Sequence, residues 1–198
     1  MPDSLVPDRV QPLLRGRFGR IYRYAELCPS TQRLLTESDE DGTVAVAEEQ
    51  SEGRGRLGRS WYAPARSSVL VSVILRPAVD PARLPELSLV AGGAVAEAIA
   101  EVTGVEPTIE YPNDVLVGNR KVAGILAEAS DGRVVLGIGI NVNQSAGELP
   151  AEARTEATSL RVELGNRVDR AQLLAAVLFR LERAYDAWVR VTGTSASG

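Results

Sequence analysis

The stretch "GRGRLGRSW" at residues 53–61 combines three glycines with three arginines. Its spacing, G-x-G-x-x-G, is typical of a dinucleotide-binding loop, but such a loop needs a helix directly after the third glycine to hold the pyrophosphate. Here Gly58 is followed by "RSWYAPARSS", which opposes a helix, and then by an apolar strand. The chain also contains no G-x-x-x-x-G-K-[ST] motif. A Rossmann loop and a P-loop are therefore both excluded.

What remains is a loop made mobile by glycine and cationic by Arg54, Arg56 and Arg59. Guanidinium groups bind phosphate oxygens in bidentate fashion and stabilise the negative charge that develops in phosphoryl or nucleotidyl transfer. The plainer alternative is a solvated basic turn. From this stretch alone both interpretations stay open.

The composition excludes several other kinds of chemistry. The chain has no histidine, which excludes Ser-His-Asp and Cys-His catalysis and histidine-containing zinc sites. Cys28 is the single cysteine, so no intrachain disulfide can form and a cytoplasmic location is expected. The apolar runs are far shorter than the roughly 20 residues of a membrane helix, so no membrane contact is expected. A net charge of −4 disfavours binding to DNA.

The hydrophobic pattern predicts which elements position these residues. Strands are expected at 43–50, 68–77 and 108–111, and as three consecutive segments between 114 and 143 joined by turns at Gly118-Asn119 and Asp131-Gly132. Helices are expected from about Ser30, over 81–104 and over 170–190, and the tail 192–198 is expected to be disordered. Strands follow one another in the middle of the chain. The pattern therefore favours an α+β fold with a mixed, largely antiparallel sheet flanked by helices.

Four motifs occur in a fixed order along the chain: "AEEQSEGRGRLGRSWYAP", "YPNDVLVGNRKVAGILAEAS", "GIGINVN" and "ATSL". Together they resemble the catalytic domain of biotin protein ligases, in the biotin/lipoate protein ligase family, whose corresponding motifs are G-R-G-R-x-G-R, K-W-P-N-D and K-x-A-G-I-L. The resemblance covers roughly residues 20–190, and its specificity lies in the combination of motifs. It implies the catalytic fold shared by class II aminoacyl-tRNA synthetases and biotin ligases.

The resemblance also implies an activity. Biotin would be activated by ATP, with Mg²⁺, to biotinyl-5′-AMP and then transferred to a lysine of a biotin carboxyl carrier protein. Neither step needs an enzyme nucleophile, which suits a chain without histidine. Two alternatives stay open. One is a lipoate or octanoate ligase of the same fold, although its Arg-Arg-x-Ser-Gly-Gly-Gly stretch is missing. The other is a biotin-binding or sensing module with weak or no transfer.

The resemblance assigns roles to particular residues. Lys121 and Arg56 are expected to be catalytic, and Asp114 to bind Mg²⁺. The expected biotin-binding residues are Ser30, Thr31, Gln32, Gln50, Arg54, Gly55, Arg56, Trp61 and Lys121. The expected nucleotide-binding residues are Arg56, Arg59, Asn113, Lys121 and Asn141.

Judged without the family, most of these residues have plainer interpretations. Ser30 and Thr31 could be ordinary helix caps, and Lys121 could extend from a buried strand to solvent. Asn113 and Asp114 could form an ordinary Asx turn.

The chain also departs from the family pattern. Glu110 and Tyr111 replace the Lys-Trp of the family motif, and Gln32 replaces an asparagine. We expect Glu110 to point away from the nucleotide, with Arg120 as a candidate partner.

The family implies further expectations about organisation. We expect residues 1–198 to form a single catalytic domain, without an N-terminal DNA-binding domain and with a C-terminal small β-barrel domain absent or cut off. The family is also compatible with a homodimer formed through a sheet edge.

Overall fold

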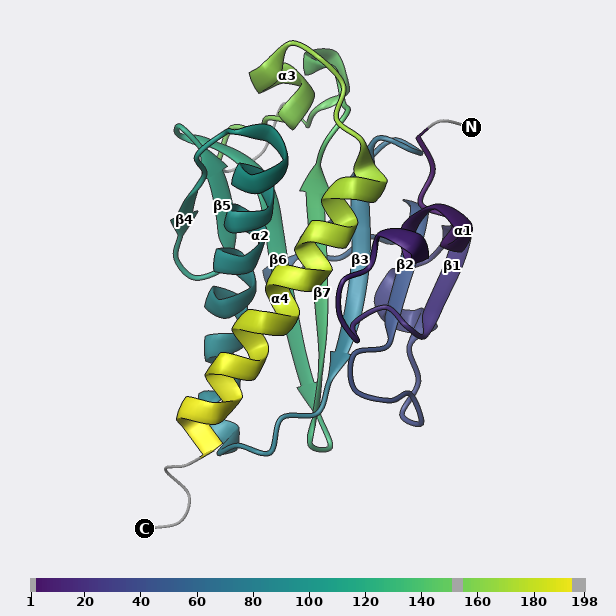
Figure 1. Cartoon of the computed structure of the whole chain (residues 1–198). Helices are drawn as coiled ribbons and strands as arrows, with labels where there is room; N and C mark the ends of the chain where they lie inside the picture. The colour runs from purple at the N-terminus through teal and green to yellow at the C-terminus, as the bar shows by residue number, and fades with distance from the viewer. Residues whose placement is uncertain (1–2, 151–154, 194–198) are drawn as a thin grey trace.

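The computed structural model describes residues 3–150 and 155–193. Its centre is a seven-stranded sheet with the strand order β1-β2-β3-β7-β6-β5-β4 (Figure 1). Strands β1 (Tyr22–Cys28) and β2 (Val44–Gln50) pair in parallel, and the other recorded pairs of neighbours are antiparallel. The predicted α+β fold with a mixed, largely antiparallel sheet is confirmed.

The remaining strands lie close to the predicted segments. They are β3 (Ser68–Leu75), β4 (Thr108–Glu110), β5 (Asp114–Val117), β6 (Arg120–Ser130) and β7 (Arg133–Asn141). Strand β3 ends before Pro77, which has no N–H to donate to a sheet. Strand β1 was not predicted, because this edge strand shows no regular alternation of buried and exposed residues.

Two long helices, α2 (Leu87–Thr103) and α4 (Arg170–Gly193), lie side by side across one face of the sheet (Figure 1). Helix α2 ends at Thr103 and is capped by Gly104, whose φ of 75° lies in the left-handed region. The shorter helices are α1 (Pro7–Val10) and α3 (Leu160–Leu164). Five short 3₁₀ helices complete the described elements: η1 (Gln11–Leu13), η2 (Thr31–Leu34), η3 (Arg56–Gly58), η4 (Pro81–Glu86) and η5 (Ala146–Glu148).

Two predicted helices differ from the observed ones. The region 81–104 was expected to be one helix, but it divides into η4 and α2, because Pro85 cannot donate the hydrogen bond of a continuous α-helix. The short helix expected from about Ser30 is the 3₁₀ turn η2. The last five residues of the predicted disordered tail, 194–198, lie outside the described residues.

The alternation along β7 divides the sheet into two faces. Val134, Leu136, Ile138 and Ile140 are buried in the same core as the apolar side chains of α2 and α4. Successive residues of a strand point to opposite faces, so Val135, Gly137, Gly139 and Asn141 face the side away from these helices. The face opposite α2 and α4 is therefore the one on which a ligand site can form.

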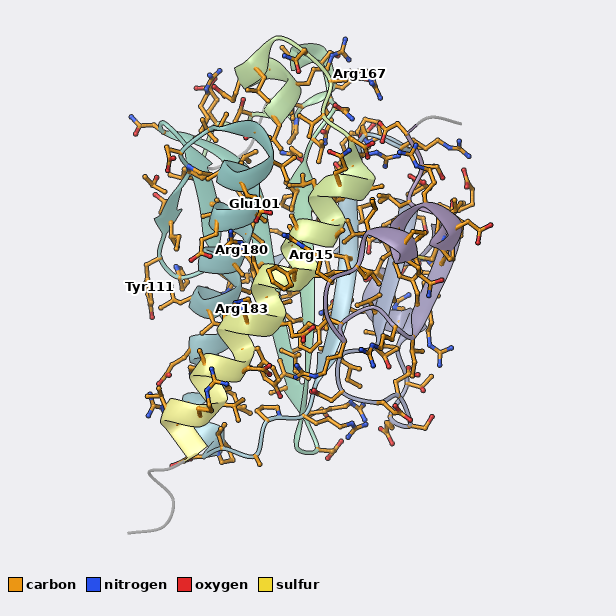
Figure 2. The ribbon with its side chains drawn as sticks, viewed as in Figure 1. Arg15, Glu101, Tyr111, Arg167, Arg180 and Arg183 are labelled. Atoms are coloured by element: carbon orange, nitrogen blue, oxygen red, sulfur yellow. The ribbon has the colours of Figure 1, made fainter. Side chains whose placement is uncertain are left out.

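The helical layer is joined to the N-terminal segment by a small charged cluster. Arg15 lies 3.0 Å from Glu101 of α2, and Arg180 of α4 lies 2.9 Å from the same carboxylate. Figure 2 shows these side chains together over the helices. Within the described part of the chain, no helix is both long enough and apolar enough to cross a membrane.

Candidate active site

A cavity of about 600 Å³ contains all the residues that were expected to form the site. This volume is in the usual range for small-molecule sites. The predicted residues that line it are Ser30, Thr31, Gln32, Gln50, Arg54, Gly55, Arg56, Arg59, Trp61, Asn113, Asp114, Lys121 and Asn141. They come from the ends of β1 and β2, the β2–β3 loop and strands β5 to β7. Their individual roles stay predictions.

A row of paired residues forms the floor of this cavity. Gly139 of β7 is paired with Gly124 of β6, Gly124 with Asp114 of β5, and Asp114 with Glu110 of β4. Directly paired residues place their side chains on the same face of a sheet. The row therefore runs from two glycines to two carboxylates on the face opposite the long helices.

Trp61 lies on the two glycines. A Cβ atom added to Gly139 would be 2.4 Å from Trp61 Cε2, and one added to Gly124 would be 2.9 Å from Cζ3. Both positions thus require glycine because the indole packs against the backbone. The indole Nε1 is buried and has no hydrogen-bond partner among the described residues. The expected role of Trp61 in biotin binding stays a prediction.

The glycine–arginine loop is an ordered turn. Gly55 N donates to Arg59 O at 2.7 Å, and Arg59 Nε donates to Arg56 O at 3.1 Å. Leu57 has a φ of 59° at the tip of the turn. The turn brings all three arginines to the cavity, which a merely solvated basic turn would not require.

Two arginines tie the loop to the rest of the site. Arg54 Nη2 lies 2.6 Å from Glu128 Oε1 on β6. Arg56 Nη1 donates to Asn113 Oδ1 at 3.2 Å. The loop is therefore held at two points, one on β6 and one on the turn between β4 and β5.

One end of the cavity is polar but uncharged. Thr31 N donates to Gln50 Oε1 at 2.7 Å, and the hydroxyls of Thr31 and Ser72 lie 2.7 Å apart. The Thr31 N–H is thus already bonded within the protein. Ser30 precedes η2, but its side chain makes no capping hydrogen bond, so the plain N-cap interpretation does not describe it. Gln32 Nε2 donates weakly to Val135 O at 3.5 Å.

Lys121 lies at the opposite, charged end. Its Nζ is 2.8 Å from Asp114 Oδ1 and 5.6 Å from the centre of the Trp61 ring. Its backbone is held by Glu156 O, which accepts from Lys121 N at 2.7 Å, and by Thr158 N, which donates to Lys121 O at 2.8 Å. The "ATSL" motif thus fixes the start of β6, and the lysine is turned into the site.

The Asp114–Lys121 pair bears on the expected magnesium site. No group of three or more His, Cys, Asp or Glu residues in the described part of the chain is arranged to hold a metal ion. The Asp114 carboxylate is already neutralised by Lys121. The described residues do not form a metal site by themselves, and the expected role of Asp114 at Mg²⁺ stays a prediction.

Two asparagines of the cavity are held in fixed orientations. Asn113 Nδ2 donates to Ile125 O at 3.1 Å. Asn141 Nδ2 donates to Thr158 O at 3.0 Å, and its Oδ1 accepts from Gln144 Nε2 at 2.9 Å. Both side chains are buried. These bonds give each amide one defined direction toward the cavity, in agreement with rigid polar contacts to a ligand.

The prediction that Arg120 is the partner of Glu110 is wrong. Arg120 Nη2 lies 2.8 Å from Glu163 Oε1 of α3, because the turn between β5 and β6 directs this arginine toward the α3 side of the sheet. In the sheet, Glu110 of β4 lies opposite Asp114 of β5, and Glu110 lines the cavity. The register of β4 and β5 therefore places Glu110 on the side of the site.

Several residues of the site were not expected from the sequence. Ser72, Leu57, Tyr62 and Gly124 all line the cavity. Ser72 could have been found from the sequence, because it is a hydroxyl inside the otherwise apolar strand "SVLVSVIL".

Cys28 is the single cysteine of the chain. Burial raises the pKa of its thiol, which disfavours a thiolate nucleophile and argues against a catalytic role for this cysteine.

The chain was then compared with known proteins. Residues 24–145 match the model of the Biotin/lipoate A/B protein ligase family. The bifunctional ligase/repressor BirA of Bacillus subtilis is 38% identical over 176 residues, which are 84% of this chain and 54% of that protein. The biotin--[acetyl-CoA-carboxylase] ligase of Mycobacterium tuberculosis is 41% identical over 161 residues, which are 79% of this chain and 59% of that protein.

A solved structure shows the same fold. The biotin protein ligase of Aquifex aeolicus, in complex with biotin and ATP, has a TM-score of 0.79 and 36% identity, covering 86% of this chain and 72% of that one. The chain spans about half the length of the two relatives above. The matched family model covers more than half of the chain, and the site motifs lie within or next to the matched region. The chain therefore belongs to the biotin/lipoate A/B protein ligase family.

Proposed function

We propose that this chain is an ATP-dependent biotin–protein ligase. In the first step, a carboxylate oxygen of biotin attacks the α-phosphate of ATP, which gives biotinyl-5′-AMP and pyrophosphate. In the second, the amine of an acceptor lysine attacks the acyl carbon and AMP leaves. The observation that carries the proposal is the division of one cavity into an uncharged polar end, an apolar middle and a cationic end.

The three parts match the three parts of the ligand. The hydroxyl of Thr31, the hydroxyl of Ser72 and the amide of Gln50 offer neutral hydrogen-bonding groups suited to a ureido ring. The Trp61 ring, packed on Gly124 and Gly139, offers a flat apolar surface suited to an aliphatic chain. Gly137, Gly139 and Asn141 lie along one face of β7. At the rise of a β-strand, the distance from Gly137 to Asn141 is about 13 Å.

The cationic end suits the chemistry of the reacting groups. We expect the ligand's carboxylate to meet the α-phosphate beside Lys121 and Arg56, and Arg59 and Asn113 line the same cavity. Adenylation of a carboxylate brings two anions together, so positioning and charge stabilisation are the main contributions that the protein has to make. Mg²⁺ would neutralise phosphate charge when bound with ATP, and we assign no protein ligand to it.

The acceptor is part of the same proposal. We infer that it is a lysine of a biotin carboxyl carrier protein, since the relative from M. tuberculosis is named a biotin--[acetyl-CoA-carboxylase] ligase. We further propose a cytoplasmic location, in line with the single cysteine. The single-domain organisation, the homodimer and the absence of DNA binding stay predictions.

ATP–pyrophosphate exchange tests this function. The exchange is measured separately with biotin, lipoate and octanoate as the only carboxylic acid. Exchange that depends on biotin alone supports the ligase, whereas exchange with lipoate or octanoate supports the alternative substrate class. Tight biotin binding in a calorimeter without any exchange would instead identify a sensing module.

A further inference from the structure

Glu110 is a carboxylate at the mouth of a site that binds anions under the proposed function. It is paired with Asp114 at the end of the row that continues through Gly124 and Gly139, so its side chain is on the face of the cavity. Strand β4 is at the edge of the sheet, and all three of its residues are exposed. Glu110 is thus open to solvent and borders the cavity.

The charges around Glu110 do not neutralise it. Asp114 is paired with Lys121, Arg54 with Glu128, and Arg120 with Glu163. None of the ion pairs recorded in the described part of the chain involves Glu110. An unpaired carboxylate near bound phosphate is unfavourable by Coulomb's law. Its position is favourable, however, when a cation arrives from solvent.

Apolar side chains surround the same opening. Leu57 is 89% exposed, Tyr111 78% and Tyr62 65%, and all three line the cavity. In Figure 2, Tyr111 lies near β4 at the outer edge of the molecule. Large apolar side chains that gather in an exposed position typically mark a binding surface.

We propose that Glu110, Tyr111 and Leu57 form the receiving site for the acceptor lysine. A lysine side chain combines an apolar stem of four methylene groups with a terminal ammonium. The stem would contact the tyrosine ring and the leucine, and the ammonium would pair with the Glu110 carboxylate. This inference rests on the proposed ligase function, because only the second step brings a lysine to the cavity.

The transfer step can be written in full. The bound ammonium loses one proton to solvent and becomes a neutral amine. Its nitrogen forms a bond to the biotinyl carbonyl carbon, the bond from that carbon to the phosphate oxygen breaks, and AMP leaves with the electron pair. The nitrogen then loses a second proton to solvent, which leaves an amide. Glu110 acts before this chemistry, because it binds and orients the charged form of the lysine.

The test separates the two half-reactions. Synthetic biotinyl-5′-AMP is supplied to the protein, and transfer to a purified biotin carboxyl carrier domain is measured. We expect Glu110→Gln to lower kcat/KM for the carrier domain about fivefold or more, mainly through KM, as expected for loss of an ion pair at a partly exposed site. Glu110→Asp should retain most of the activity, and Glu110→Lys should lose more than Glu110→Gln.

Two controls make the result specific. Hydroxylamine is uncharged at neutral pH and also cleaves the adenylate, so Glu110→Gln should leave this reaction unchanged. Glu106→Gln removes an exposed carboxylate that lies outside the cavity, before the start of the same edge strand, and should leave transfer unchanged. ATP–pyrophosphate exchange by Glu110→Gln should not fall below that of the unaltered protein, because the variant removes a negative charge near the bound phosphates.

Several outcomes would overturn the inference. Equal loss of reactivity toward the carrier domain and hydroxylamine would mean that Glu110 acts on the adenylate. An unchanged KM for the carrier domain would mean that the lysine docks elsewhere. A tenfold gain in exchange by Glu110→Lys would make Glu110 a brake on nucleotide binding. If the unaltered protein shows no biotin-dependent exchange but transfers from synthetic adenylate, the first half of the proposed function fails and the lysine site is still tested. Failure of both reactions overturns both proposals.

Discussion

Lys121 forms an ion pair with Asp114 before any substrate arrives. Its ammonium lies 2.8 Å from the Asp114 carboxylate and above the ring of Trp61. An incoming carboxylate or phosphate must therefore share or replace Asp114 as the partner of this lysine. If the anion replaces Asp114, that carboxylate needs another cation, because a buried ion without a partner is costly.

Replacing Lys121 tests its predicted catalytic role. We expect Lys121→Ala to reduce ATP–pyrophosphate exchange about a hundredfold, since a lost charge-assisted contact to the developing phosphate charge costs about 3 kcal/mol. Arg120→Ala is the matched control, because its partner Glu163 lies outside the cavity. Thermal unfolding checks that both variants fold. Exchange by Lys121→Ala within threefold of the unaltered protein would contradict the assignment.

At the scale of elements, the β2–β3 loop combines two requirements. Under the proposed function it must open to admit substrates and must then cover a reactive anhydride. Two contacts hold the loop: the ion pair of Arg54 with Glu128 and the hydrogen bond from Arg56 to Asn113. Each is a single polar contact at the edge of the cavity. Contacts of this kind are weak enough to break and re-form, so the loop can be ordered without being locked.

We expect Arg56→Gly to release the adenylate without destroying the site. The variant loses the contact with Asn113 and gains backbone freedom, so biotinyl-5′-AMP should escape and label lysines on bystander proteins. The measurement is biotinylation of serum albumin mixed with the enzyme, biotin and ATP. Arg54→Gly, which removes the ion pair with Glu128, is the variant whose albumin labelling is compared with that of Arg56→Gly. If Arg56→Gly labels albumin no more than the unaltered enzyme does, the loop does not retain the adenylate.

The segment before β2 provides a prediction about pH. Burial alone would raise the pKa of Asp39, but hydrogen bonds from Arg23 and from Thr36 outweigh it and lower the pKa below its ordinary value of 3.8. A carboxylate with a depressed folded pKa stabilises the fold above its unfolded pKa, and this contribution disappears as the pH falls through the folded pKa.

Asp39→Asn should therefore destabilise the protein by about 1–2 kcal/mol near neutral pH. The difference from the unaltered protein should shrink as the pH falls below about 3.8 and vanish below the lower folded pKa, where the native carboxyl also becomes neutral. Urea unfolding at several pH values measures both effects. Asp8→Asn, at an exposed site in α1, is the control. A difference that stays constant down to acid pH would show that the charge of Asp39 is not what stabilises the segment.

At the scale of the whole molecule, one buried ion pair joins distant parts of the chain. Arg170, at the start of α4, lies 2.7 Å from Glu48 of β2 and 2.9 Å from Asp3, and both Arg170 and Glu48 are fully buried. The other oxygen of Glu48 accepts from Leu5 N at 2.8 Å. The pair therefore fastens the N-terminal segment and α4 to the strand that leads into the site.

Breaking this pair should destabilise the fold. We expect Arg170→Met to cost about 3–5 kcal/mol, because it leaves the Glu48 carboxylate buried and unpaired. The double variant with Glu48→Leu should recover part of this loss. Arg167→Met is the matched control, since Arg167 contacts the same Asp3 at the surface and should cost less than about 1 kcal/mol (Figure 2). Equal unfolding free energies for Arg170→Met and Arg167→Met would contradict this account.

The sequence by itself determined the local elements and the chemical content of the site. Strands β2, β3 and β5 to β7 and helices α2 and α4 were predictable, because apolar periodicity, proline and glycine act over a few residues. The motifs also named the arginines of the loop, Lys121 and the two asparagines. Edge strand β1 was missed because its irregular burial carries no periodic signal.

Only the tertiary structure decided which of these residues meet. Trp61 lies on Gly124 and Gly139, and Asp114 separates Lys121 from Glu110, although these residues belong to different strands and a loop. Arg120 was a candidate partner for Glu110 by nearness in sequence, but it pairs with Glu163 of α3. The physical reason is register: a strand carries a pattern of period two, but its neighbour and its alignment are selected by the packing of the complete sheet against α2 and α4.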